Sequence, residues 1–251
     1  MNRIQKAFIG FITAGDPSLD KTEEFILEME KAGAALVEIG IPFSDPIAEG
    51  PVIQEANLRA LSAGCTTDKI FDMVAKLRKK TQIPLAFMAY ANSLYKYGYD
   101  RFCKRCAEVG IDGLIIPDMP FEEKGELQEF TGKYDLKLIS LIAPTSQERI
   151  QMIAKEAEGF IYVVSSLGVT GVRDTITTDV GQIVDMIRQV TDVPTAVGFG
   201  INKPEQVHQY TQIADGAIVG SAIVRIVAQY GEQAGPKIYE YVSEMVGGLA
   251  E

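Results

Sequence analysis

The sequence has few residues of the kinds that bind metals or form disulfides. Its 251 residues include three cysteines and one histidine. An odd number of cysteines makes no disulfide framework and is typical of a reducing compartment, so we expect a cytoplasmic protein. The single histidine, His208, cannot supply the imidazole cluster of a catalytic zinc site. Cys103 and Cys106 have no second pair to complete a structural zinc site, and we therefore expect no bound metal.

Basic runs and long apolar runs are also absent. The chain has 24 Lys and Arg against 34 Asp and Glu, which gives a formal net charge of −10. Nucleic acids and anionic lipids are bound mainly through clustered Lys and Arg, so we expect neither as a partner. No apolar stretch reaches the roughly 18–20 residues that span a bilayer, and we expect no association with a membrane.

Short apolar runs, in contrast, recur along the whole chain. Their continuous apolar character is typical of strands buried on both faces of a parallel sheet. Segments with the spacing of amphipathic helices lie between them. The eight runs cover residues 8–13, 36–39, 85–89, 114–117, 138–143, 160–165, 195–199 and 217–219.

This alternation predicts an α/β protein that is a single (β/α)8 TIM barrel with eight parallel strands, one domain over residues 1–251. A doubly wound open sheet is the alternative. The longest connections follow the second and sixth strands and predict functional loops at residues 40–54 and 166–178. We expect extra short helices in the loops after the second and eighth strands.

One carboxylate stands inside an otherwise apolar strand. Glu38 lies in the run Leu-Val-Glu-Ile-Gly of residues 36–40, at the end of the second expected strand. Burial costs a carboxylate several kcal/mol unless it is paired or protonated, and it raises the pKa toward that of a general acid or base working near neutral pH. The alternative is a structural carboxylate that accepts hydrogen bonds from backbone amides. No lysine occupies the end of an expected strand, which argues against a Schiff-base aldolase.

Glycines mark the ends of the last three expected strands. They are Gly168 and Gly171 after the sixth, Gly198 and Gly200 at the seventh, and Gly220, followed by Ser221 and a short helix, at the eighth. Backbone N–H groups exposed by glycine beside a helix N-terminus cradle phosphate, and barrels often bind phosphate at this place. The alternative is ordinary turn chemistry. We expect a small phosphorylated substrate that is handled by carboxylates.

Several sequence blocks together resemble the α subunit of tryptophan synthase. The most specific are Pro-Phe-Ser-Asp-Pro at residues 42–46, Gly-Val-Thr-Gly at 168–171 and Gly-Phe-Gly-Ile at 198–201. The resemblance implies retro-aldol cleavage of indole-3-glycerol phosphate to indole and glyceraldehyde 3-phosphate, without a cofactor, in L-tryptophan biosynthesis. It also implies a β subunit that receives the indole, in an α2β2 heterotetramer.

The resemblance also implies roles for individual residues. Glu38 is the general acid/base and Glu49 the second catalytic carboxylate, which faces the indole nitrogen. Asp45 contacts the β subunit, although from local sequence it is equally a turn residue beside Pro46. Phe11 and Tyr162 line the substrate site, although from the residues alone both are better read as core. The remaining substrate-binding positions are Thr170, Gly171, Phe199, Gly200, Gly220 and Ser221.

The chain departs from the family pattern in two places. The family commonly has Asp where this chain has Glu49, and one extra methylene moves the carboxylate by about 1–1.5 Å. The alternative function is therefore a weakly or non-catalytic partner that activates the β subunit allosterically, and a free-standing lyase that releases indole is a third possibility. Only residues 1–6 precede the first expected strand, where relatives often carry a helix, so we expect other residues to cover the barrel bottom, or that it stays partly open.

Overall fold

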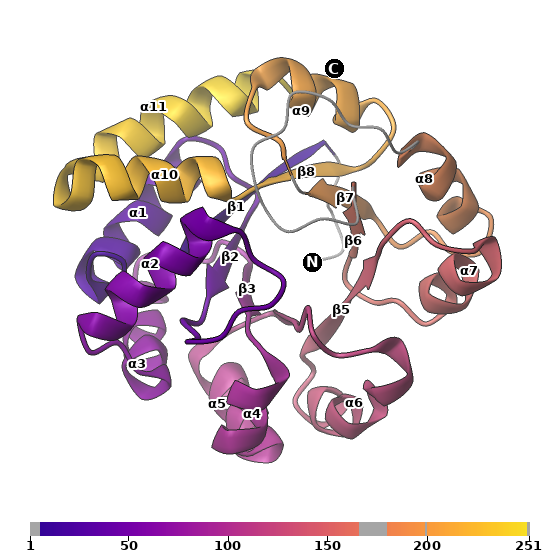
Figure 1. Cartoon of the computed structure of the whole chain (residues 1–251), viewed down its shortest axis with the longest axis horizontal. Coiled ribbons are helices and arrows are strands. Elements are labelled where there is room, and N and C mark those ends of the chain that lie inside the picture. The colour runs from indigo at the N-terminus through magenta and orange to yellow at the C-terminus, as the bar shows by residue number, and fades with distance from the viewer. Residues whose placement is uncertain (1–5, 166–179, 199, 250–251) are drawn as a thin grey trace.

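The eight strands form one closed parallel barrel in chain order, β1 to β8 (Figure 1). The computed structural model describes residues 6–165, 180–198 and 200–249. The barrel confirms the predicted fold class and excludes the open sheet. The strands are β1 (Ala7–Thr13), β2 (Leu36–Gly40), β3 (Leu85–Met88), β4 (Gly113–Ile115), β5 (Lys137–Ile142), β6 (Ile161–Val164), β7 (Thr195–Gly198) and β8 (Gly216–Val219).

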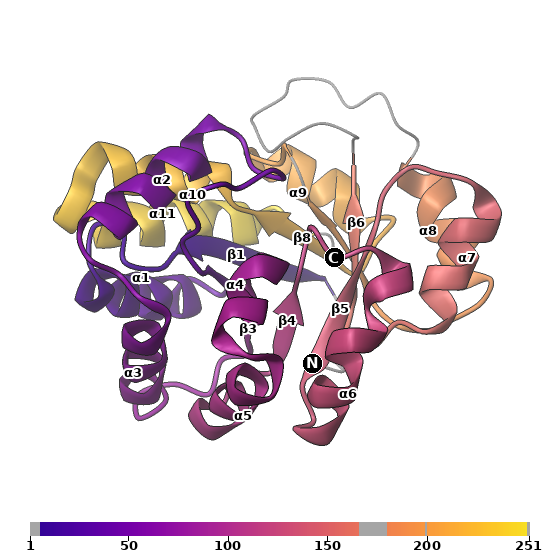
Figure 2. The same cartoon turned by 60° about the horizontal axis from the view of Figure 1, so that its bottom comes forward.

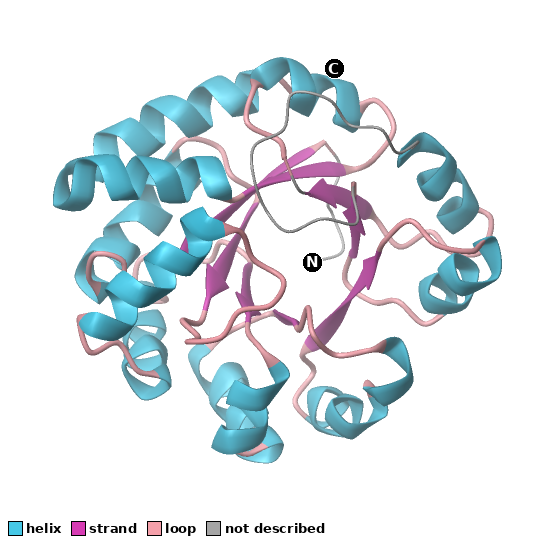
Figure 3. Ribbon diagram, viewed as in Figure 1, coloured by secondary structure: helices cyan, strands magenta, loops and turns pink. Residues whose placement is uncertain are grey.

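Helices surround the barrel on its outside (Figure 3). Two of them, α2 and α10, occupy the loops in which extra helices were predicted. The α-helices are α1 (Leu19–Lys31), α2 (Pro51–Ser62), α3 (Thr67–Leu77), α4 (Ala91–Tyr97), α5 (Tyr99–Val109), α6 (Gly125–Lys133), α7 (Gln147–Lys155), α8 (Val180–Arg188), α9 (Pro204–Thr211), α10 (Ser221–Tyr230) and α11 (Ala234–Gly247). Short 3-10 helices lie at Phe121–Glu123 and Gly231–Gln233. No helix in these described ranges is both long and apolar enough to span a membrane.

The core has two layers because successive strand residues face opposite sides of the sheet. Along β1, Phe8 and Ile12 pack toward the helices, whereas Ala7 and Ile9 belong to a separate cluster inside the barrel. Phe160 joins that inner cluster and is fully buried. The sequence analysis expected that the residues before β1 would not cover the bottom of the barrel. Most of these, residues 1–5, lie outside the described residues.

Two acidic residues, placed just before β4 and β8, hold the N-terminal ends of neighbouring strands in register. Asp112 precedes β4 and accepts the N–H of Leu85, the first residue of β3, at 2.9 Å. Asp215 precedes β8 and accepts the N–H of Thr195, the first residue of β7, at 2.8 Å. Since these contacts repeat at the opening of the barrel remote from the strand C-termini, they stabilise the frame and leave the other end free for function.

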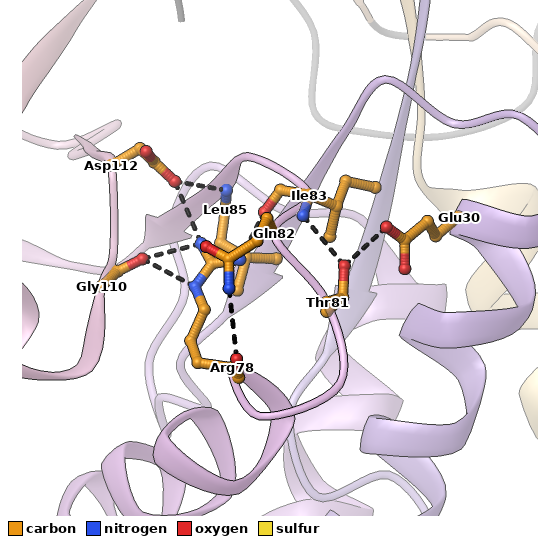
Figure 4. Close-up of polar contacts among 8 residues, drawn as sticks. All are labelled: Glu30, Arg78, Thr81, Gln82, Ile83, Leu85, Gly110 and Asp112. Carbon is orange, nitrogen blue, oxygen red and sulfur yellow. Dashed lines mark hydrogen bonds and ion pairs between the residues drawn. The ribbon is translucent and has the colours of Figure 1, made fainter.

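Arg78, at the end of α3, ties two loops together at the same end of the barrel, the one before β3 and the one before β4 (Figure 4). Its guanidinium donates to the carbonyl oxygens of Gly110, at 2.9 and 2.7 Å, and of Ile83, at 2.6 Å. It also donates to the Asp112 carboxylate at 3.1 Å. Burial lowers the pKa of Arg78, which the Asp112 charge partly offsets.

Candidate active site

A cavity lies at the C-terminal ends of the strands, the end at which barrel enzymes place their chemistry. In Figure 2 the arrow of β4 points toward this end of the barrel, which lies at the top of the view. The cavity has an empty volume of about 660 Å³, part of it open to solvent. Seven residues predicted from the sequence line it together: Phe11, Glu38, Glu49, Tyr162, Gly200, Gly220 and Ser221.

Glu38 is fully buried in the inner wall of the barrel. It is the central residue of β2 rather than its last, and it lies in register between Phe11 of β1 and Ala86 of β3. Neither carboxylate oxygen has a hydrogen-bond partner in the described part of the chain, so the alternative reading as a structural carboxylate bonded to backbone amides is wrong. Burial raises the pKa of Glu38 to about 8.

The apolar strand explains this shift of the Glu38 pKa. Water and cations stabilise an ionised carboxylate, and inside the barrel desolvation is the dominant influence on Glu38. The side chain is therefore mostly protonated near neutral pH and able to donate a proton. A group that donates a proton near pH 7 and recovers it afterwards is what general acid/base catalysis requires.

Glu49 is buried in the loop between β2 and α2, with 6% of its surface exposed. Asn57 of α2 donates its side-chain N–H to Glu49 Oε2 at 2.8 Å. Burial raises the pKa of Glu49 to about 7, and the Asn57 hydrogen bond acts in the opposite direction. Both cavity carboxylates thus have perturbed pKa values, which is typical of functional sites.

Tyr90, which immediately precedes α4, holds the loop that carries Glu49. Its hydroxyl accepts the backbone N–H of Ala48 at 3.1 Å, and its ring stacks on Phe43 with centroids 5.1 Å apart. Burial, followed by the Glu49 charge, raises the pKa of Tyr90. Sequence reasoning missed both Tyr90 and Asn57, because nothing local distinguishes a tyrosine at a strand end or an asparagine in a helix.

Two glycines at strand ends make room for the aromatic walls. A Cβ at Gly40 would lie 2.6 Å from the Phe11 ring, and a Cβ at Gly198 would collide with the Tyr162 hydroxyl. Both rings lie inside the cavity wall, where Phe11 is 3% and Tyr162 5% exposed. Gly198 therefore has a packing role. The sequence analysis predicted it only as part of a phosphate-binding site.

The predicted phosphate cradle is partly described. Gly220 is the N-cap residue of α10, Ser221 is the first residue of that helix, and both line the cavity. Gly200 lines it from the loop after β7, in a left-handed conformation with φ of +87°. The N-terminus of a ten-residue helix that opens into the cavity offers backbone N–H groups and a favourable dipole to an anion.

Of the remaining predicted residues, the structure describes only Asp45, which is not among those that line this cavity. Asp45 is exposed in the loop between β2 and α2 and accepts the Ser44 hydroxyl at 2.5 Å. Thr170, Gly171 and Phe199 lie outside the described residues. Within the described ranges, no group of three or more His, Cys, Asp and Glu side chains is arranged to hold a metal ion.

Comparisons with known proteins agree on one family. The model of the family described as "Tryptophan synthase alpha chain" matches residues 1–248. The tryptophan synthase alpha chain of Lacticaseibacillus casei is 49% identical over 240 residues, which cover 96% of this chain and 90% of that one. The relative of the same name from Alkaliphilus metalliredigens is 51% identical over 220 residues, covering 88% and 83%. A chain in the crystal structure of the tryptophan synthase complex from Pyrococcus furiosus superposes with a TM-score of 0.90 at 33% identity, covering 97% and 98%.

Proposed function

The chain belongs to the tryptophan synthase alpha chain family, and from this premise we propose that it cleaves indole-3-glycerol phosphate to indole and glyceraldehyde 3-phosphate. The observation that carries the proposal is the pair of carboxylates, Glu38 and Glu49, in one cavity with pKa values raised to about 8 and about 7. Such groups exchange protons near neutral pH and need no cofactor.

Glu38 moves the protons in this proposal. Its protonated carboxyl donates a proton to C3 of the indole ring, which becomes tetrahedral while the ring nitrogen becomes positively charged. The resulting Glu38 carboxylate takes the proton from the hydroxyl on the adjoining side-chain carbon. The C–C bond then breaks: its electron pair returns to the ring to release indole, and the former alcohol carbon becomes the aldehyde of glyceraldehyde 3-phosphate.

Glu49 stabilises the charge that develops between these two steps. In the proposal its carboxylate accepts the ring N–H, so it acts in the ionised form while Glu38 begins in the protonated form. Placing two carboxyl groups in environments that assign them opposite roles is a recurrent way to run acid and base chemistry in one site. The extra methylene of Glu49, compared with the usual aspartate, is taken up by the loop between β2 and α2.

Other cavity residues bind the rest of the substrate in the proposal. The indole ring lies against Phe11 and Tyr162, and aromatic walls suit a flat bicyclic ring. The phosphate lies at Gly200, Gly220 and Ser221, beside the N-terminus of α10. Thr170, Gly171 and Phe199 remain proposed substrate-binding residues on the family pattern alone.

Indole passes to a β subunit in an α2β2 heterotetramer, as the last part of L-tryptophan biosynthesis. Solved relatives include a "tryptophan synthase a2b2 complex" from Pyrococcus furiosus, which supports this partner. Asp45 is proposed as a contact with that subunit, because it is exposed on the loop that also carries Glu49. We place the enzyme in the cytoplasm, since its three cysteines are free and buried. Residues 1–251 are proposed to form one domain.

Indole release from indole-3-glycerol phosphate, measured with and without a β subunit, tests the proposal. We expect turnover that rises when the β subunit is added. Activation of the β subunit without lyase turnover under any condition would instead support the allosteric partner, which the Glu49 departure favours. Full turnover with no binding to a β subunit would support a free-standing lyase.

A further inference from the structure

Glu49 is held by a side chain that the sequence analysis did not select. Asn57 donates to Glu49 Oε2 at 2.8 Å, and this hydrogen bond is buried because Asn57 is only 3% exposed. A second contact acts on the backbone, where Gln54 donates to the carbonyl oxygen of Glu49 at 2.7 Å. The first contact orients the carboxylate, whereas the second fixes only the main chain.

Helix geometry explains how Asn57 reaches a residue that precedes its own helix. Side chains in an α-helix are tilted toward the helix N-terminus. Asn57 lies in the second turn of α2 and therefore points back toward the loop that ends at its N-cap residue, Gly50. Ile53, Ala56 and Ala60 are buried on α2, so the face from which Asn57 extends is packed against the barrel.

An ion pair holds α2 in place. Arg59 donates two hydrogen bonds to Asp16, at 2.9 and 2.8 Å, and Asp16 lies in the loop after β1 with 2% of its surface exposed. A bidentate guanidinium–carboxylate pair fixes both distance and orientation. Asn57 is thus presented to Glu49 from a helix that is anchored to the barrel rather than from a loop.

Resting on the proposed lyase function, we propose that Asn57 is a positioning residue that holds the Glu49 carboxylate at the cavity wall, turned toward the substrate. An amide NH2 group only donates, so it binds a carboxylate oxygen that carries no proton and favours the ionised form. In the described part of the chain, the Glu49 charge acts on Tyr90, from the loop after β3, and Glu38, from β2, lines the same cavity. Burial and Asn57 are the influences on the pKa of Glu49.

The ratio of variant to wild-type kcat, measured for Asn57→Ala across the pH range, tests the proposal. Loss of one hydrogen bond to a charged group raises the pKa of Glu49 by about 1 unit. With a starting pKa of about 7, Glu49 is then ionised in about one tenth rather than half of the molecules at pH 7. We expect kcat to fall about fivefold at pH 7 and the gap to narrow to less than twofold by pH 9. Ionisation of Glu38 affects the pH dependence of kcat in both proteins alike, so it cancels in the ratio.

Two further variants separate positioning from packing. Asn57→Asp keeps the volume but places a second carboxylate beside Glu49, so we expect a larger gap at pH 7 that closes at a higher pH than for Asn57→Ala. Glu55→Gln is the control, because it changes an exposed charge on the same helix. A loss in Asn57→Ala that stays constant from pH 6 to 9 would overturn the proposal, since a merely structural residue lowers activity at all pH values alike.

A direct titration keeps this inference distinct from the lyase function. The Glu49 side-chain carbon is observed by 13C NMR in glutamate-labelled protein and assigned by its disappearance in Glu49→Gln. We expect its titration midpoint to move up by about 1 pH unit in Asn57→Ala. An unmoved midpoint overturns the role of Asn57 even if the lyase is active. A wild-type chain that releases no indole, with the midpoint still moved, overturns the function and leaves the Asn57–Glu49 contact established.

Discussion

Replacing Glu38 by glutamine should stabilise the protein increasingly as the pH rises. Glutamine keeps the shape of the side chain but cannot ionise. The pKa of Glu38 is raised from its ordinary value of 4.5 to about 8 by burial. A carboxyl group whose folded pKa lies above its unfolded pKa binds protons preferentially in the folded state, so its stabilising contribution is complete below pH 4.5 and is lost as the pH rises through 8.

The size of the effect follows from the two pKa values. Each unit of difference is worth about 1.4 kcal/mol once the group is ionised in the unfolded state. Ionisation of Glu38 in the unfolded chain therefore lowers the stability of the wild type by about 1 kcal/mol at pH 5.5 and about 4 kcal/mol at pH 8. Between pH 5.5 and pH 8, the free energy of unfolding of Glu38→Gln should therefore rise by about 3 kcal/mol relative to that of the wild type. For a chain of this size this corresponds to roughly 6–12 °C in Tm.

Thermal unfolding of both proteins at several pH values between 5.5 and 8 measures this difference. The informative quantity is how the difference in Tm between Glu38→Gln and wild type changes with pH. Any packing cost of the amide is the same at every pH and therefore does not contribute to that change. Glu122→Gln is the control: the pKa of Glu122 is lowered to about 2 by the Arg149 hydrogen bond, so it is ionised in both states throughout the interval and its gap to wild type should stay constant. If the difference in Tm between Glu38→Gln and wild type also stayed constant with pH, Glu38 would not be buried in its protonated form, and the reasoning would be refuted.

Three other substitutions test separate parts of the site and frame. Glu49→Asp should leave kcat unchanged or higher, because it restores the side chain usual in the family, and a hundredfold loss in the indole assay would show a loop rebuilt around glutamate. Gly198→Ala should raise KM at least tenfold, since its methyl group displaces the Tyr162 ring from the cavity wall; an unchanged KM would contradict that contact. Arg78→Met should lower the free energy of unfolding by about 2–4 kcal/mol in urea titrations, because it leaves carbonyls such as that of Gly110 without a donor, and should leave kcat intact.

The barrel could be predicted from sequence because parallel strands buried on both faces leave continuous apolar runs. The residues at which each strand begins and ends could be predicted less accurately. The expected strand at residues 114–117 is β4 at Gly113–Ile115, and the expected strand at 160–165 is β6 at Ile161–Val164. Apolar residues just beyond a strand end are buried as well, as Ile116 is, so hydropathy alone does not show where ladder hydrogen bonding stops.

Within the site, Glu38 could be expected at the cavity wall because its side chain conflicts with its local surroundings. Glu38 is a charge in an apolar strand, and it lies unpaired in the cavity wall as that conflict implies. Asn57 and Tyr90 gave no such signal, because their importance depends on contacts with Glu49 and Ala48 from other parts of the chain. Gly198 was recognised, but its contact with a ring on the neighbouring strand becomes visible only in the folded barrel.

Single-turnover release of indole by Glu38→Gln, with the β subunit present, tests the proton-transfer role most directly. Glutamine cannot donate the proton to C3 or recover one from the hydroxyl, so we predict a rate at least about a thousandfold below wild type while indole-3-glycerol phosphate still binds. A rate within tenfold of wild type would mean that another group moves these protons, and the assignment of Glu38 would be wrong.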